Sequence, residues 1–144
     1  MRIPPAIDEA VRDVARARTD ASDDLARAKQ RLGSFLLRIG RRYAQKTLWT
    51  EAHMRYLREL TLPHPGHKIV LEEYLQAIDS GIDRVARLTE QMKALLNDWE
   101  WQPVVRALMA CKGFQEVAAM TIVSDAAIHA LPCSITNPPV FPMP

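Results

Sequence analysis

Two heptad patterns dominate this 144-residue sequence. In the first, residues spaced alternately three and four apart are apolar over four heptads, with one arginine among them: Val11, Val14, Arg18, Ala21, Leu25, Ala28, Leu32, Phe35 and Ile39. The second pattern repeats this spacing at Leu71, Tyr74, Ile78, Gly81, Val85, Leu88, Met92, Leu95 and Trp99. Such spacing is typical of helices that bury one stripe against another helix. With a short connector between them, the two patterns predict a long antiparallel helical hairpin that forms a coiled coil.

Capping and breaking residues predict the ends of these helices. Asp8 is a candidate N-cap for the first long helix, and Gly40 follows its last apolar residue, where a helix often ends in a left-handed conformation. Thr47 is a candidate N-cap for a short helix over 48–60, at the tip of the hairpin. Pro65 can open the second long helix, because proline suits the first helical turn.

A pair of shorter helices is expected after the second heptad pattern. One runs over 103–110, Gly113 turns the chain, and the other runs over 115–130. The turn resembles that of a helix-hairpin-helix, in which backbone N–H groups hold a phosphate. That turn usually has two glycines around an apolar residue, and here Gln115 replaces the second glycine. The spacing therefore favours a plain helical corner packed on Phe114, with phosphate binding as the alternative.

The fold class expected from these patterns is all-α. We expect an extended lead-in at 1–7, a coiled-coil hairpin with a basic tip at 8–100, and the helix-hairpin-helix-like pair at 101–130. Five of the ten prolines fall in the last fourteen residues, so 131–144 is expected to be a disordered tail. Two cysteines are too few for a disulfide framework, and no apolar run reaches the ~18 residues of a membrane span. With no signal peptide at the start, we expect a cytoplasmic protein and no membrane partner.

Basic residues are concentrated around the connector of the hairpin. Ten lysines and arginines lie between Arg27 and Lys68 against two glutamates, a local charge of +8 in a chain whose total is +2. Such a field attracts phosphate, although a solvated helical face is the alternative. The residues predicted to bind nucleic acid are Arg38, Arg41, Arg42, Lys46, Arg55, Arg58, Lys68, Lys112 and Gly113.

Four aromatic residues could stack on bases: Trp49, Tyr56, Trp99 and Trp101. At helical spacing such residues more often belong to the core, and Trp49, beside Lys46 and Arg55, is the best candidate for a nucleic-acid contact.

No catalytic or metal-binding constellation is evident. His53, His64 and His67 lack further ligands at zinc spacing. The carboxylates of the first helix follow one another along its polar positions and cannot converge on one ion. Ser134 lies in the proline-rich tail, which would not hold a base beside it. We expect no catalytic residue, no metal site and no cofactor in this chain.

The order of segments resembles transposases of the insertion-sequence family one-ten. The resemblance covers about Ile7 to Asp125 and depends on the whole ordered series, which is "DEAVRDVARARTDASDDLARAKQRLGSFLLRIGRRY", "WTEAHMRYLREL", "LPHPGHKIVLEEYLQAID", "RVARLTEQMKALLNDW" and "PVVRALMACKGFQEVAAMTIVSD". Members of this family are DEDD-type, RNA-guided recombinases of bacterial mobile elements.

The resemblance implies an order of domains with different roles. In the family, a RuvC-like domain with four acidic ligands for Mg²⁺ comes first, a coiled-coil region follows, and a C-terminal domain supplies a serine nucleophile. This sequence matches the second part and the start of the third. The acidic residues are expected upstream of Met1, and the serine downstream of the point where "IHALPCSITNPPVFPMP" takes over.

The resemblance therefore predicts a transposase fragment that lacks the catalytic residues, and we do not expect it to be an active enzyme alone. It would bind DNA, with guide RNA as a further candidate ligand, in DNA transposition and recombination, and would form a homo-oligomer through the coiled coil. The alternative is a coiled-coil oligomerisation module without a nucleic-acid role.

Overall fold

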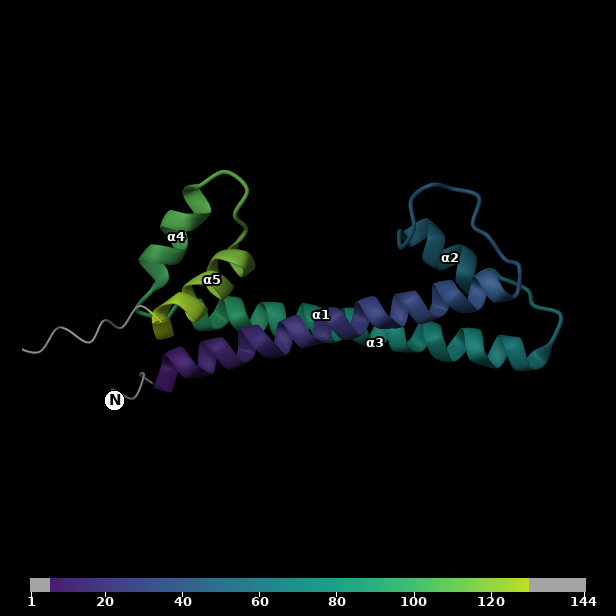
Figure 1. Ribbon diagram of the computed structural model, residues 1–144, viewed down its shortest axis with the longest axis horizontal. Helices are drawn as coiled ribbons and strands as arrows, with labels where there is room; N and C mark the ends of the chain where they lie inside the picture. Colours follow the sequence, from purple (N-terminus) through teal and green to yellow (C-terminus); the bar gives the residue numbers. More distant parts are fainter. Residues whose placement is uncertain (1–5, 130–144) are drawn as a thin grey trace, which may run out of the picture. The chain divides into compact units, whose positions relative to one another are not determined.

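The computed structural model describes residues 6–129, which form five helices and no strand (Figure 1). The helices are α1 (Ala6–Arg38), α2 (Glu51–Glu59), α3 (Pro65–Leu96), α4 (Gln102–Ala110) and α5 (Glu116–His129). The predicted all-α class is confirmed. The predicted tail at 131–144 and most of the lead-in at 1–7 lie outside the described residues.

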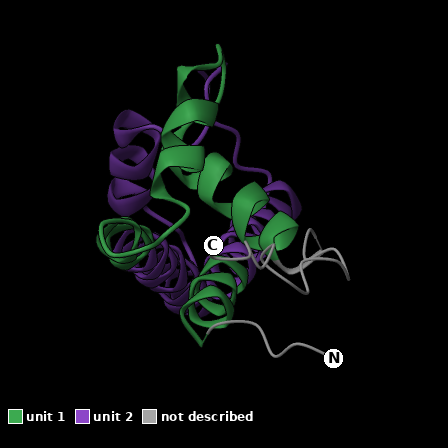
Figure 2. Cartoon of the chain, turned by 90° about the vertical axis from the view of Figure 1, so that its left-hand side faces the viewer, with its two compact units in different colours: residues 1–16, 89–144 green, residues 17–88 purple. Residues whose placement is uncertain are grey.

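These helices are grouped into two compact units, shown in different colours in Figure 2. Unit 1 comprises residues 1–16 and 89–144, and unit 2 comprises residues 17–88. The division falls within the two long helices, so α1 and α3 each contribute a segment to both units. Each unit has an apolar core of its own.

Unit 2 is built on the antiparallel pairing of α1 and α3, with α2 packed against both. Its buried core residues are Ala28, Leu32, Phe35 and Leu36 from α1, Met54 and Leu57 from α2, and Leu71, Leu75 and Ile78 from α3. Gly81 allows the two long helices to approach closely, because a Cβ atom at this position would lie 3.1 Å from Cδ1 of Leu25. The small residue Gly81 within the heptad stripe thus allows α1 and α3 to pack closely in this unit.

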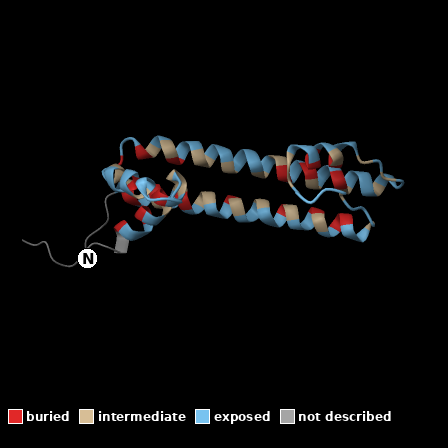
Figure 3. Ribbon diagram, turned by 90° about the horizontal axis from the view of Figure 1, so that it is seen from above, coloured by how far each residue is buried: buried red, intermediate tan, exposed pale blue. Residues whose placement is uncertain are grey.

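Unit 1 packs α4 and α5 over the beginning of α1 and the end of α3. Its buried core residues are Val11, Ala15, Met92, Leu96, Trp99, Val105, Ala119, Met120 and Val123. The carboxylate of Asp8 is also buried here and accepts a hydrogen bond of 2.7 Å from Nε1 of Trp99. Figure 3 shows buried positions recurring among exposed ones along the helices. Every residue of the two heptad patterns is buried or half-buried, as their spacing predicts.

The predicted helix ends were partly right. Gly40 has a φ of 70° just after α1, and Pro65 is the first residue of α3, so both predictions are confirmed. The N-cap prediction for Asp8 was wrong, because α1 begins at Ala6 and Asp8 lies within its first turn. The prediction for Thr47 was also wrong.

Thr50 caps α2 in place of Thr47. Its hydroxyl accepts a hydrogen bond of 3.3 Å from the backbone N–H of His53. The helix cannot extend back over the predicted range 48–60, because Trp49 has a φ of 63°, in the left-handed region.

The second helical pair follows the predicted order with one correction. Gly113 turns the chain with a φ of 101° between α4 and α5. Phe114, however, is 40% exposed, so the predicted packing of this corner on Phe114 was wrong. The two helices instead pack through Val105 of α4 and Ala119 and Met120 of α5, which belong to the core of unit 1. The predicted last residue of this pair, at 130, lies outside the described residues.

Candidate nucleic-acid interface

Seven of the nine predicted contact residues lie at one end of unit 2, which we term the basic end. It comprises the last turns of α1, the connector 39–50, α2 and the first turns of α3. Arg38 closes α1, and Arg41, Arg42 and Lys46 lie in the connector. Arg55 and Arg58 lie on α2 and Lys68 on α3, and all seven residues are exposed. In sequence, seven basic residues and no acidic residue occur between Asp24 and Glu51.

Ion pairs divide these seven residues into two groups. One nitrogen of the Arg58 guanidinium donates to both carboxylate oxygens of Asp79, at 3.0 and 3.2 Å, and Lys68 lies 3.9 Å from Glu72. Within residues 6–129, no carboxylate pairs with the other five, which are Arg38, Arg41, Arg42, Lys46 and Arg55. These five side chains therefore carry the positive charge that the basic end offers to an anion.

A shallow groove runs along α1 into the basic end. It has a volume of about 430 Å³, and its basic lining residues are Arg27, Arg31 and Arg38. Phe35 and Tyr74 also line it, with ring centroids 5.9 Å apart in an edge-on arrangement. Arginines along a groove suit the phosphate backbone of a nucleic acid.

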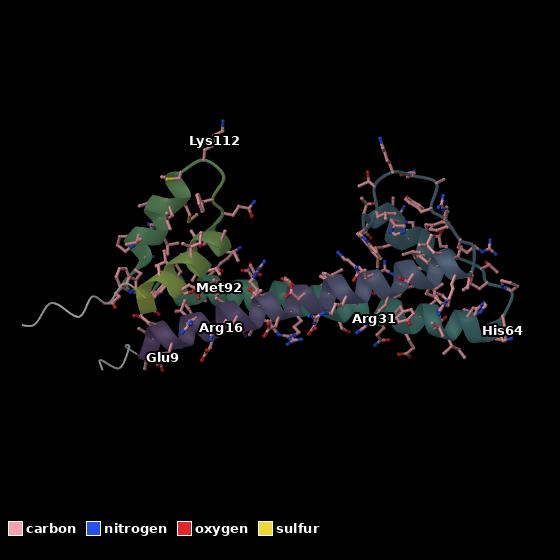
Figure 4. All side chains as sticks on the ribbon, in the orientation of Figure 1. Glu9, Arg16, Arg31, His64, Met92 and Lys112 are labelled. Carbon is pink, nitrogen blue, oxygen red and sulfur yellow. The ribbon has the colours of Figure 1, made fainter. Side chains whose placement is uncertain are left out.

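The sequence prediction did not single out Arg31 and Tyr74 as site residues. Figure 4 labels Arg31, on the part of α1 that belongs to unit 2. The spacing of Arg27, Arg31 and Arg38 by four and seven residues places them on one side of a helix, and this signal could have identified the row. Arg27 is compensated by Asp24 at 3.0 Å, whereas no carboxylate of the described residues pairs with Arg31.

A cluster of aromatic rings fixes the connector onto α2. His53 is 3% exposed and contacts Tyr43, Trp49 and Tyr56, with ring centroids 4.6, 5.2 and 6.5 Å away. Its Nδ1 accepts a hydrogen bond of 3.0 Å from the backbone N–H of Trp49. Burial lowers the pKa of His53, which favours the neutral ring that this acceptor role requires.

Trp49 is the best-placed aromatic residue for a nucleic-acid contact. It is half-buried, and Nζ of Lys29 lies 5.5 Å from the centroid of its ring. The cation beside it is therefore Lys29 of α1, where the sequence suggested Lys46 and Arg55. Of the other aromatic candidates, Trp99 is buried in the core of unit 1, and Trp101 packs against that core.

The last two predicted contact residues belong to unit 1. Lys112 and Gly113 are exposed in the turn between α4 and α5, and Figure 4 shows the Lys112 side chain directed away from the turn. The backbone at Gly113 permits the turn, and Lys112 supplies one positive charge.

His53 and His64 make contacts within unit 2. His53 is enclosed by aromatic rings, and Nδ1 of His64 accepts the backbone N–H of Gly66 at 3.0 Å. Within the described part of the chain, no three histidine, cysteine, aspartate or glutamate side chains are arranged to hold a metal ion. Over the same residues, no helix has an apolar stretch long enough to span a lipid bilayer.

Comparisons with known proteins give one informative relative. The chain is 32% identical over 123 residues to a protein described as "Putative transposase y4qE" from Sinorhizobium fredii (strain NBRC 101917 / NGR234). This similarity supports a transposase family. The matched region covers 85% of this chain and 28% of the relative, so the chain spans less than a third of the length of that protein. No protein-family model and no solved structure matches the chain.

Proposed function

We propose that this chain is the nucleic-acid-binding and assembly part of an insertion-sequence transposase of the DEDD type, acting in DNA transposition and recombination. The observation that carries the proposal is the basic end, where five exposed cations have no carboxylate partner among the described residues. The relationship to a transposase supplies the biological setting for such a surface. The proposal assigns no catalytic step to this chain; carboxylate ligands for Mg²⁺ and a serine nucleophile would come from other parts of the transposase.

Binding through the basic end is electrostatic and largely independent of base sequence. Arginine and lysine contacts to phosphates position a protein on nucleic acid without reading the bases. Each phosphate contact on duplex DNA contributes about −0.9 to the slope of log affinity against log salt concentration. Five contacts would therefore give a slope of about −4 to −5. We propose DNA as the ligand and guide RNA as a further one, in the cytoplasm.

Self-association is the second part of the proposal. Large apolar side chains remain exposed on unit 2, including Ile69 at 62% and Ile82 at 43%. Several residues of the heptad stripes are only half-buried, so a second copy of the chain could pack on the stripes as well as on these outward-facing residues. We therefore expect a homo-oligomer of this helical region.

A salt titration tests the proposed nucleic-acid role. Binding of the chain to a short DNA duplex is measured over a range of salt concentrations for the wild type and for Arg41→Ala/Arg42→Ala. Loss of two phosphate contacts should flatten the slope by roughly two units. The matched control is Arg84→Ala/Arg87→Ala, which removes the same charge from α3 of unit 2. Arg84 pairs with Asp24, about 20 Å along α1 from Arg38, so its removal should leave the slope nearly unchanged.

The rival function predicts a different result. An oligomerisation module would show no binding to the duplex at low salt, while sedimentation would still show an assembly larger than a monomer. Equal slopes for the two double variants would show that the connector does not contact phosphate.

A further inference from the structure

A cavity of about 370 Å³ lies beneath the connector of unit 2 and is separate from the arginine groove along α1. Its apolar lining comes from α1, through Gly33, Leu36 and Leu37, and from Leu48 of the connector. The connector and His53 of α2 supply the rest of the lining. All of these elements belong to unit 2.

The wall of this cavity is aromatic and held in place. Tyr43, Trp49 and His53 all line it. Trp49 has a left-handed backbone, a conformation that is strained for a bulky residue and persists only when the surroundings enforce it. Here the hydrogen bond from its N–H to His53 and the ring contact between the two residues supply that constraint. The aromatic surfaces are therefore preorganised before any ligand arrives.

Positive charge lines the same cavity. Arg41 and Arg42 belong to its lining, are exposed, and have no carboxylate partner among the described residues. Apolar side chains, aromatic rings and two uncompensated guanidinium groups together suit a flat ring attached to an anionic backbone. A purely apolar side chain from a protein partner would leave both guanidinium groups without an anionic partner.

Gly33 of α1 lines the cavity. Glycine is less favourable than alanine within a helix, so its presence calls for a reason. At Gly81 the reason is close packing against Leu25, but a Cβ atom at Gly33 would meet nothing within 4 Å. Packing therefore does not require glycine here, and the lining of the cavity has space for a larger side chain at this position.

We infer that this cavity binds one unpaired nucleobase of a nucleic acid whose phosphates contact Arg41 and Arg42. The inference rests on the proposed nucleic-acid function and names the structural form of ligand that the basic end prefers. Stacking of a base on an aromatic side chain does not depend on which base it is, because every base has a π-face. The cavity thus selects unpaired over paired nucleic acid without reading sequence.

The experiment compares three DNA duplexes at one salt concentration by fluorescence anisotropy. One is fully paired, one carries a single bulged adenine, and one carries an abasic residue at the bulge, so the last two have the same number of phosphates. The wild type should bind the adenine bulge about 5- to 150-fold more tightly than the abasic bulge, the range expected for stacking one base on aromatic side chains. The abasic bulge should bind much like the paired duplex.

Two substitutions at one position test the cavity itself. Gly33→Leu adds a large side chain to the cavity lining and should abolish the preference, so that the adenine bulge and the abasic bulge bind equally. Gly33→Ala adds one methyl group and should keep most of the preference. Both changes increase helix propensity, so α1 should remain folded, which circular dichroism checks. Trp49→Leu supplies an independent test, because it keeps apolar bulk and removes the stacking surface.

The possible results separate the inference from the proposed function. Binding to all three duplexes with no preference for the adenine bulge would overturn the cavity inference and leave electrostatic binding intact. A preference that survives both Gly33→Leu and Trp49→Leu would place the base elsewhere and would equally overturn it. Failure to bind any duplex at low salt would overturn both.

Discussion

Nε1 of Trp99 donates a hydrogen bond to Oδ1 of Asp8 across 2.7 Å, and both residues are almost fully buried. The two residues are 91 positions apart in sequence, and the bond joins the first turn of α1 to the residue that follows α3 by three positions. A hydrogen bond to a buried carboxylate is stronger than one between neutral groups. Within unit 1, this hydrogen bond therefore connects the start of α1 to the segment that follows α3.

Replacing Asp8 tests the strength of this link. Asp8→Ala leaves the buried indole N–H without a partner, which should lower the free energy of unfolding by about 1–3 kcal/mol. Asp8→Asn keeps an acceptor oxygen and should cost less. Glu9→Ala is the matched control, because Glu9 also lies in the first turn of α1 but is exposed. Urea unfolding measures all three, and equal losses for Asp8→Ala and Glu9→Ala would show that only the helix dipole is involved.

His53 should make the stability of unit 2 dependent on pH. Burial lowers the pKa of His53, so the folded chain binds this proton less readily than the unfolded chain does. Stability should therefore be fully present above the unfolded pKa of about 6.5 and should decline as the pH falls below it. The decline ends once the pH has dropped through the lower folded pKa.

Denaturant unfolding at pH values on both sides of 6.5 measures this effect. His53→Asn keeps an acceptor for the N–H of Trp49 and should remove this part of the pH dependence. If the free energy of unfolding of the wild type stays constant as the pH falls below about 6.5, the pH dependence assigned to His53 is wrong.

The N-cap of α2 offers a direct comparison of two threonines. Thr50→Ala removes the hydroxyl that accepts the N–H of His53 and should cost about 0.5–2 kcal/mol. Thr47→Ala changes an exposed connector residue and should stay within about 0.5 kcal/mol of the wild type. Thermal melting of the two variants checks this order, and a larger loss for Thr47→Ala would place the helix start where the sequence suggested.

The sequence predicted the features that depend on local periodicity and backbone restriction. The heptad spacing identified the buried stripes of both long helices, and Gly40 and Pro65 marked helix ends because each has a backbone preference of its own. The start of α2 was missed because a left-handed Trp49 is imposed by tertiary contacts with His53, which no local pattern records.

The sequence predicted the positive charge of the candidate site but not its individual ion pairs. The run of basic residues identified the basic end, yet the pairing of Arg58 with Asp79 joins residues 21 positions apart and could not be read from spacing. The same holds for the burial of Asp8 beside Trp99. Arg31 was overlooked although its helical spacing carried a usable signal, because the prediction weighed the connector more heavily than the face of α1.

The last prediction separates the free and the paired arginine of α2. Arg55 and Arg58 are three residues apart, and both are exposed. Arg58 is held by both oxygens of Asp79, whereas no carboxylate of the described residues pairs with Arg55. If the basic end binds phosphate, Arg55→Ala should weaken duplex binding and flatten the salt slope by about 0.9, the value for one phosphate contact.

The matched comparison removes the ion pair as a unit. Arg58→Ala/Asp79→Ala leaves the net charge unchanged, so it should alter neither the affinity nor the slope, and loss of a surface ion pair should cost at most about 1 kcal/mol of stability. Salt titrations of the two variants against one duplex give the answer. Should the double variant flatten the slope as much as Arg55→Ala does, Arg58 must leave Asp79 for phosphate on binding, and the free charge of the basic end would extend along the whole of α2.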